Sequence, residues 1–415
     1  MKGLVAKGAS GNIIVQSLKR RLAGVEGVDA KAANKAASDA AKLMSEKVIP
    51  ALKRQIDALA KLRKDAVHDA GIWRIKDGDR FYSVALRAFT TSSMPPDDIH
   101  KLGLDLGKDL TAQMDAILKA QGMSQGSVAQ RIQALSKSPQ QLYANTDAGR
   151  EKLLADLNRQ IEALQPLLAK NFGTLAKAKV EVRRVPPFKE AGSPGGYYEQ
   201  GSLDGSRPGY YFINLRDTKE WPKFTLPTLT YHEAEPGHHW QGSIALENAS
   251  LPLMRSAILW FSGYGEGWAL YSEQLADEMG VYKDDPFGRL GYLQSAAFRA
   301  ARLVCDTGLH SKRWSREQAI NYMVEATGDQ RTSIATEIER YSVWPGQACA
   351  YMLGRESIRN LRESAKTKLG AKFDIRAFHD VVLKDGAVPL SVLETIVNGW
   401  VAAQMAPPSA PAAKK

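Results

Sequence analysis

The strongest candidates for catalytic or metal-binding residues in this sequence are a dense group of histidines. The chain contains seven histidines, and three of them fall within eight residues: His232, His238 and His239. Glu233 directly follows the first. Two imidazoles beside a glutamate are the typical ligands and general base of a zinc hydrolase. The run therefore predicts a metal site, and the alternative is a polar surface helix that happens to carry histidines.

The spacing of these histidines departs from the usual His-Glu-x-x-His pattern by two extra residues. On an ideal helix the step from His232 to His238 turns about 600°, and the step to His239 about 700°. Only His239 would return to the starting face, one turn farther along. Pro236 and Gly237 alter this geometry, because proline removes a backbone donor and glycine relaxes the chain. A kink there would swing His238 back toward His232.

A third ligand is expected in a second acidic segment. Glu266 follows His238 by 28 residues, which suits an antiparallel return of the chain. Glu273 lies seven residues further on and would share one helix face with Glu266. Two nitrogens and one carboxylate leave one position of a tetrahedral zinc site open for water, as catalysis requires. The alternative is an exposed pair of carboxylates.

The elements that must position these residues are mainly helical. Apolar side chains recur with helical spacing over most of the chain, with a change to strand-like alternation near the centre. The segments predicted as helices are 13–65, 97–121, 148–173 and most of 228–405; those predicted as strands are 179–185 and 210–215. We divide the sequence into a basic helical region, 1–177, a metal-binding region with the small β element, 178–405, and a disordered tail, 406–415.

Composition and charge bear on whether the protein binds nucleic acid or a membrane. The 415 residues carry 56 basic and 45 acidic side chains, a formal charge of +11. Residues 1–200 hold 32 basic and 21 acidic groups, and residues 201–415 hold 24 of each. The whole excess of positive charge therefore lies in residues 1–200. Solvated helix faces explain this simply, and no zinc finger or RNA-binding signature accompanies it. We expect no nucleic-acid partner and no membrane span; the oligomeric state stays open.

Two central motifs carry a family resemblance. The chain resembles the bacterial family called domain of unknown function 885 (DUF885), marked by His-Glu-Ala-x-Pro-Gly-His-His-x-Gln and then Glu-Gly-Trp-x-x-Tyr-x-Glu. Residues 232–241 and 266–273 match these patterns without a departure. Further matches extend the resemblance over nearly the whole chain; they lie in 90–103, 204–209, 302–310 and 345–354. Family members are usually longer at the N-terminus.

The family in turn resembles the zinc peptidases called gluzincins, of the thimet oligopeptidase and neurolysin type. This resemblance implies a large multi-helical, neurolysin-like fold with a small β-sheet element before the metal-binding helix. It implies one Zn²⁺ per chain, with Glu266 as ligand, and with Glu273 orienting a ligand histidine. It favours His238 over His239 as the second nitrogen ligand, and Glu233 as the base.

Candidates for the remaining roles follow from the same resemblance and from residue chemistry. The developing oxyanion needs a donor besides the metal, and Tyr351 and then His310 are the candidates. Arg207 and Arg302 are candidates for binding a substrate carboxylate. The strand 210–215, which includes Tyr211, is a candidate for pairing with an extended peptide.

The function expected is that of a zinc metallopeptidase. It would cleave short peptides by Glu-assisted attack of zinc-bound water. The alternatives are a zinc amidase acting on a non-peptide or cell-wall amide, and a non-catalytic helical binding protein. The N-terminal residues lack the apolar core of a signal peptide, and the location of the protein stays open, with export expected if a preceding segment belongs to it.

Overall fold

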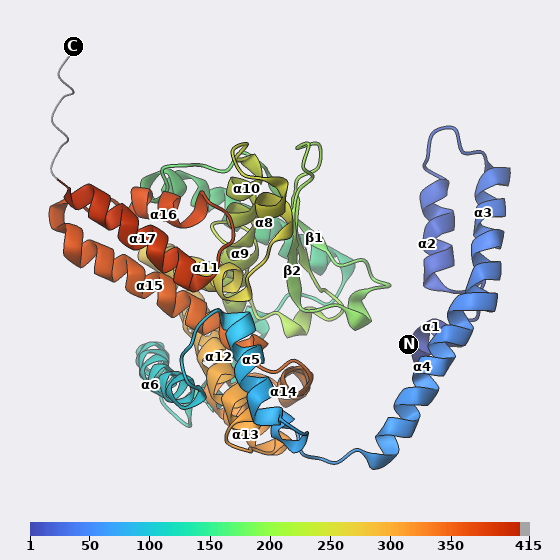
Figure 1. Cartoon of the computed structure of the whole chain (residues 1–415), viewed down its shortest axis with the longest axis horizontal. Helices are drawn as coiled ribbons and strands as arrows, with labels where there is room; N and C mark the ends of the chain where they lie inside the picture. The colour runs from blue at the N-terminus through green and yellow to red at the C-terminus, as the bar shows by residue number, and fades with distance from the viewer. Residues whose placement is uncertain (407–415) are drawn as a thin grey trace, which may run out of the picture. The chain divides into compact units, whose positions relative to one another are not determined.

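Residues 1–406 are described by a computed structural model, in which the chain forms two units (Figure 1). The first unit is Met1–His68, and the second begins at Asp69. This boundary reflects packing, whereas the regions 1–177 and 178–405 differ in charge and composition. The predicted tail lies outside the described residues, except for Ala406.

The first unit consists of helices α1 (Lys2–Ala6), α2 (Ile13–Leu22), α3 (Ala30–Leu43) and α4 (Ile49–Leu62). The prediction of helix over 13–65 is confirmed with one interruption, at residues 23–29. Gly27 there takes a left-handed φ of 81°, which favours glycine. The Asp29 carboxylate then accepts a hydrogen bond from the Ala32 amide at 2.7 Å and so caps α3.

The second unit is also mainly helical, and its helices α6 and α8 confirm the predictions for 97–121 and 148–173. Its α-helices are α5 (Gly78–Thr90), α6 (Pro96–Ala120), α7 (Val128–Ser136), α8 (Asp147–Asn171), α9 (Leu226–Glu233), α10 (His238–Glu247), α11 (Ser262–Glu278), α12 (Pro286–His310), α13 (Arg316–Thr327), α14 (Arg331–Val343), α15 (Ala350–Leu369), α16 (Ile375–Leu383) and α17 (Leu390–Met405).

Close helix packing in this unit depends on small residues. Helix α12 is buried along most of its length, and Gly103 of α6 lies so near that a Cβ there would be 2.7 Å from Val304 Cγ2. Helices α11 and α15 meet at Gly267 and Gly354, where a Cβ on Gly267 would lie 2.5 Å from the Gly354 backbone. This contact brings the segment around Glu266 against α15.

A three-stranded mixed sheet precedes helices α9 and α10, where the sequence predicted a small β element. Strands β1 (Val180–Arg184) and β3 (Gly209–Ile213) are parallel, and β2 (Gly196–Glu199) pairs antiparallel with β3, in the order β1-β3-β2. The strands expected at 179–185 and 210–215 are therefore confirmed. Strand β2 was not predicted, because glycine and proline surround its short Tyr-Tyr core. The fold is mainly α with a small sheet.

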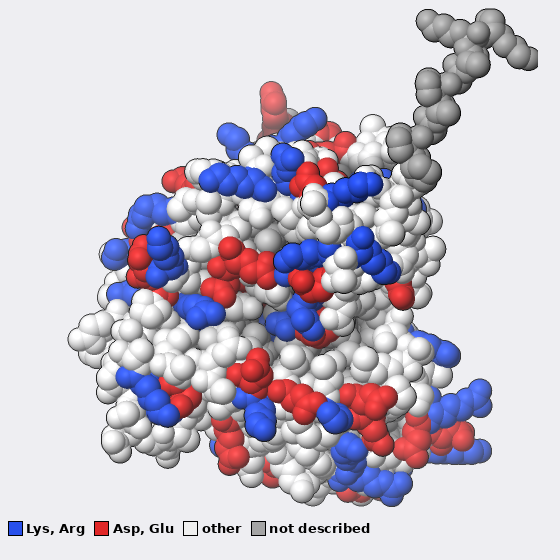
Figure 2. Space-filling view, turned by 90° about the vertical axis from the view of Figure 1, so that its left-hand side faces the viewer, with Lys and Arg blue, Asp and Glu red and all other residues white. Residues whose placement is uncertain are grey.

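Charged side chains of both signs are interspersed on the face drawn in Figure 2, rather than gathered by sign. Elsewhere in the described residues, some opposite charges form exposed pairs one helical turn apart, such as Lys35 with Asp39. Within the described residues, no helix combines the length and the hydropathy needed to cross a bilayer.

Candidate metal centre

The run of histidines is divided between two helices. Helix α9 ends at Glu233 and α10 begins at His238, so the helix is interrupted around Pro236 as the sequence predicted. Gly237 packs against the end of α9, where a Cβ would lie 1.9 Å from the His232 carbonyl oxygen. No side chain fits there. The interruption therefore changes the direction of the chain and removes the ideal-helix spacing between His232 and His238.

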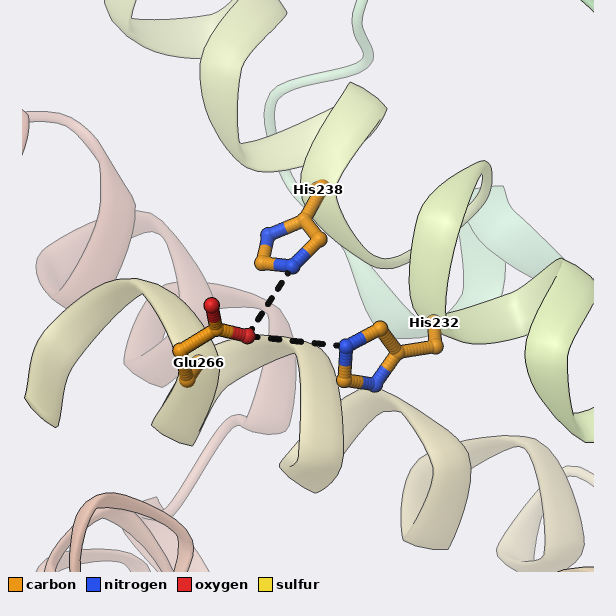
Figure 3. A group of neighbouring side chains, drawn as sticks. All are labelled: His232, His238 and Glu266. Atoms are coloured by element: carbon orange, nitrogen blue, oxygen red, sulfur yellow. Dashed lines mark ion pairs between the residues drawn. The ribbon is translucent and has the colours of Figure 1, made fainter. Parts of the chain in front are cut away.

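His232, His238 and Glu266 converge on one point (Figure 3). Nε2 of His238 lies 3.3 Å from Glu266 Oε2, and Nε2 of His232 lies 3.6 Å from the same oxygen. One ligand atom from each residue lies within 4.8 Å of the others. The two imidazole rings are nearly perpendicular, at 88°. This group could hold a metal ion.

His232 is oriented by a buried carboxylate. Glu273 is fully buried, and its Oε1 lies 2.8 Å from His232 Nδ1. Its other oxygen accepts a hydrogen bond from Ser295 Oγ at 2.8 Å. With Nδ1 donating to Glu273, Nε2 of His232 faces His238 and Glu266, and in the neutral ring this nitrogen carries the lone pair that binds a metal. A carboxylate behind a ligand histidine is the usual support of such a site.

His239 belongs to a different network. Its Nε2 lies 2.9 Å from the Ala178 carbonyl oxygen and its Nδ1 lies 3.1 Å from the Tyr198 hydroxyl. Burial lowers the pKa of His239 to about 4, so the ring is neutral. By contrast, the buried Nδ1 of His238 has no hydrogen-bond partner in the described part of the chain. The group that could hold a metal thus contains His238 rather than His239.

The electrostatics of the group reflect its burial. Burial alone would raise the pKa of Glu266, but its contacts with His232 and His238 outweigh this and lower it. Burial disfavours protonation of His232, yet its contacts with Glu266 and Glu273 raise its pKa to about 9. Burial raises the pKa of Glu233, and the charges of the two histidines oppose the shift. Glu233 is therefore a buried carboxyl group next to the candidate ligands.

Of the other predicted residues, Tyr351 is close enough for Glu266 to affect it, and Arg302 contacts Tyr351. Burial raises the pKa of Tyr351, and the negative charge of Glu266 raises it further. The Arg302 guanidinium stacks on the Tyr351 ring, 4.3 Å from its centroid. Arg302 donates to the Tyr341 hydroxyl and to Glu337, both at 3.0 Å, while its buried Nη1 has no partner within residues 1–406.

Tyr211 is buried beside Glu233, whose charge contributes to the raised pKa of this tyrosine after the larger effect of burial. The expectation that an extended peptide pairs with residues 210–215 is wrong, because β3 is the central strand and both of its edges are taken by β1 and β2. Within residues 1–406, β2 has one edge without a partner strand, and this strand contacts α9 and α10.

His310 and Arg207 are engaged elsewhere. His310 accepts a hydrogen bond from the Ile72 amide at 3.0 Å, and its Nε2 lies 3.1 Å from the Tyr341 carbonyl oxygen. Both ring nitrogens are thus occupied. Arg207 donates to the Gln200 carbonyl oxygen at 2.6 Å and stacks on Tyr210. The structure gives neither residue a contact with the candidate ligands.

Sequence reasoning missed two neighbours of the group. Trp260 packs its ring 5.8 Å from the His238 ring, and no motif contains it. Arg299 lies 3.9 Å from Glu273 and its charge acts on Glu233. Its position one helical turn before Arg302 could have indicated that both face the same side.

Comparisons with known proteins support the family resemblance. The family described as "Bacterial protein of unknown function (DUF885)" matches residues 2–397. A crystal structure of a protein from Colwellia psychrerythraea, described as a "putative lipoprotein", is 44% identical, with a TM-score of 0.94 over 97% of this chain and 68% of that one.

A second solved structure, a Shewanella oneidensis "putative lipoprotein of unknown function", is 23% identical with a TM-score of 0.68. It covers 92% of this chain and 69% of that chain, and it supports the fold alone. No curated protein matches the sequence. The family match over most of the length and the similarity to the Colwellia protein agree with the motifs at 232–241 and 266–273. The chain belongs to the DUF885 family of bacterial proteins.

Proposed function

We propose that this protein is a zinc-dependent peptidase that hydrolyses short peptides, with a gluzincin-like site. The observation that carries the proposal is the convergence of His232, His238 and Glu266, with the buried Glu233 beside them. A scaffold protein needs no such set. A hydrolase needs ligands, a general base and an oriented ligand histidine at one place, and these residues can supply all three.

The donor set fits zinc. Two imidazole nitrogens and one carboxylate oxygen are the protein ligands of many catalytic zinc sites, and they leave a coordination position for water or substrate. In His238, Nδ1 is buried, and in His232, Nδ1 contacts Glu273. In both residues it is Nε2 that lies near Glu266 Oε2. Zinc held there would polarise the scissile carbonyl group and lower the pKa of a water molecule.

Glu233 is the proposed general base and acid. Its carboxylate would accept a proton from the attacking water and pass it to the departing amine nitrogen. Burial raises the pKa of this carboxyl group, which makes it a better proton acceptor than an exposed glutamate. The same group then has a proton to donate when the peptide C–N bond breaks.

Tyr351 and Arg302 are proposed to act on the substrate. The Tyr351 hydroxyl would donate a hydrogen bond to the oxyanion that develops from the carbonyl oxygen. Burial raises its pKa, so the phenol keeps its proton at neutral pH. Arg302 lies against the Tyr351 ring and offers an unpartnered Nη1, which suits a substrate carbonyl or carboxylate oxygen.

The substrate backbone is proposed to lie along β2 rather than β3. Strand β2 (Gly196–Glu199) has one unpaired edge and contacts both α9 and α10. An extended peptide can add to such an edge through main-chain hydrogen bonds, which do not depend on its sequence. This geometry favours peptides over other amides, because only a peptide repeats the donor and acceptor pattern of a strand.

The test is digestion of a defined peptide mixture by the zinc-reconstituted protein, read by mass spectrometry. We expect new fragments that disappear when a chelator removes the metal and return when zinc is restored. Hydrolysis of simple or cell-wall amides without peptide cleavage would favour the amidase. A protein that binds zinc and cleaves nothing would contradict the proposal and favour a binding protein.

A further inference from the structure

Trp260 occupies an unusual position beside the candidate metal centre. Its ring lies 5.8 Å from the ring of His238, at an interplanar angle of 52°. Trp260 as a whole residue is nevertheless 55% exposed, whereas only 12% of the His238 side chain is exposed. One part of the indole is therefore held against the site while the rest faces solvent.

The sequence makes room for this indole. Gly265, the residue before Glu266, lies directly under the ring, and a Cβ there would be 2.1 Å from Cη2 of Trp260. Any other residue at 265 would displace the ring, which lies next to His238. The close approach to Gly265 and the contact with His238 thus hold the indole beside the site.

The segment that carries Trp260 has further exposed apolar residues. Four other large apolar side chains of this segment are 42–63% exposed. They are Leu253, Met254, Ile258 and Leu259. Their exposure does not come from a loose loop, because Arg255 Nη2 donates to the Asp385 carbonyl oxygen at 2.6 Å and Asn248 Nδ2 donates to the Lys384 carbonyl oxygen at 2.8 Å. Contiguous exposed apolar side chains next to a polar site are typical of ligand-binding surfaces.

We infer that Trp260 is a specificity-determining residue that selects substrates with an aromatic or large aliphatic side chain next to the reacting bond. The inference rests on the proposed function and names its substrate class. An occupant at the candidate metal centre would place its neighbouring side chain against the exposed part of the indole. An apolar side chain there would exclude water from both surfaces, whereas a polar one would lose hydrogen bonds to water without replacement.

The experiment compares two peptides that differ only at the residue beside the cleaved bond, one with Phe and one with Ser. For the wild type we expect kcat/KM to be at least about tenfold higher with Phe, which is within the range of apolar pockets. Trp260→Ala should remove most of that preference and Trp260→Phe should retain it. Met405→Ala, at the far end of α17 and 57% exposed, is the control and should leave it unchanged.

Binding to the Glu233→Gln variant separates this inference from the proposed function. Calorimetry with the same peptides should show tighter binding of the Phe peptide, and the added Trp260→Ala should abolish the difference. If the wild type hydrolyses neither peptide but the binding difference is retained, the proposed peptidase activity is contradicted and the role of Trp260 in selecting apolar side chains is supported. Equal losses with both peptides, or no binding difference, would overturn the inference. The inference would also be overturned if the wild type is a dimer and Trp260→Ala makes it monomeric without changing the preference for the Phe peptide. The exposed apolar residues around Trp260 would then belong to an interface with a second copy of the chain.

Discussion

Glu273 and His232 form a buried carboxylate–imidazole pair, with 2.8 Å between Oε1 and Nδ1. They come from different helices, α11 and α9, and the contact fixes which nitrogen of His232 faces Glu266. Glu273 is thus connected to the candidate ligands through His232, and it also accepts a hydrogen bond from Ser295. In the proposed site the two glutamates, seven residues apart, would have different roles: Glu266 would face the metal, and Glu273 would support the ligand His232.

The first prediction concerns this pair. Glu273→Gln should lower the affinity for zinc by about 10- to 100-fold, because the amide supports the ligand imidazole less well than a carboxylate. The dissociation constant is measured by competition with a chromogenic chelator. Glu278→Gln, in the same helix but paired with Arg362, is the matched control. Equal affinities of the Glu273 variant and the wild type would remove the supporting role.

The second prediction separates the adjacent histidines. His238→Ala should abolish stoichiometric zinc binding, because it removes one of three ligands. His239→Ala should retain zinc, since its ring contacts Ala178 and Tyr198 instead. Metal content after dialysis is measured by inductively coupled plasma mass spectrometry, with circular dichroism to establish folding. Loss of zinc only in the His239 variant would contradict the assignment.

The third prediction concerns protons released by metal binding. The pKa of His232 is raised to about 9 by Glu266 and Glu273 against the effect of burial, so this imidazole is protonated at pH 7.5 in the metal-free protein. Zinc requires the neutral ring, and binding should therefore release about one proton and strengthen as the pH rises toward 9. Calorimetric titrations in buffers of different ionisation enthalpy measure the release. A binding enthalpy independent of the buffer at pH 7.5 would contradict this prediction.

The fourth prediction tests the proposed oxyanion donor. Tyr351→Phe should reduce kcat by about 10²- to 10³-fold, as expected for the loss of one such donor, and leave zinc content unchanged. KM should change little, because the hydrogen bond strengthens only as the oxyanion forms. Tyr292→Phe, a buried tyrosine of α12, serves as a control for the loss of a hydroxyl. A change in KM alone would assign Tyr351 to substrate binding.

Local sequence signals predicted the main features of the fold. The helices around 97–121 and 148–173 follow from apolar periodicity, and β1 and β3 follow from alternation. Strand β2 could not be predicted, because its four residues gain their structure from pairing with β3. The break at residues 23–29 depends on the left-handed Gly27 and on the Asp29 cap of α3. The spacing of apolar residues, from which the helix was predicted, contains no information on either.

For the candidate site, the ligand types and the pairing of Glu273 with a histidine could be predicted, but the neighbours Trp260 and Arg299 could not. His232, His238 and Glu266 have recognisable types and spacing, and the kink at Pro236 made their convergence plausible. Trp260 and Arg299 carry no such signal, since their proximity to His238 and Glu273 arises from tertiary packing. The strand order β1-β3-β2 also could not be predicted from the sequence. Because β3 is the central strand in this order, it has no free edge for a peptide.

The zinc peptidase mechanism is tested most directly by comparing the wild type with Glu233→Gln, with zinc content and peptide turnover measured on the same preparations. We expect about one zinc per chain in both proteins, with turnover reduced by roughly a thousandfold or more in the variant, because Gln cannot transfer the proton. A wild type that binds no zinc after reconstitution, or a zinc-loaded variant that keeps full turnover, would contradict this mechanism.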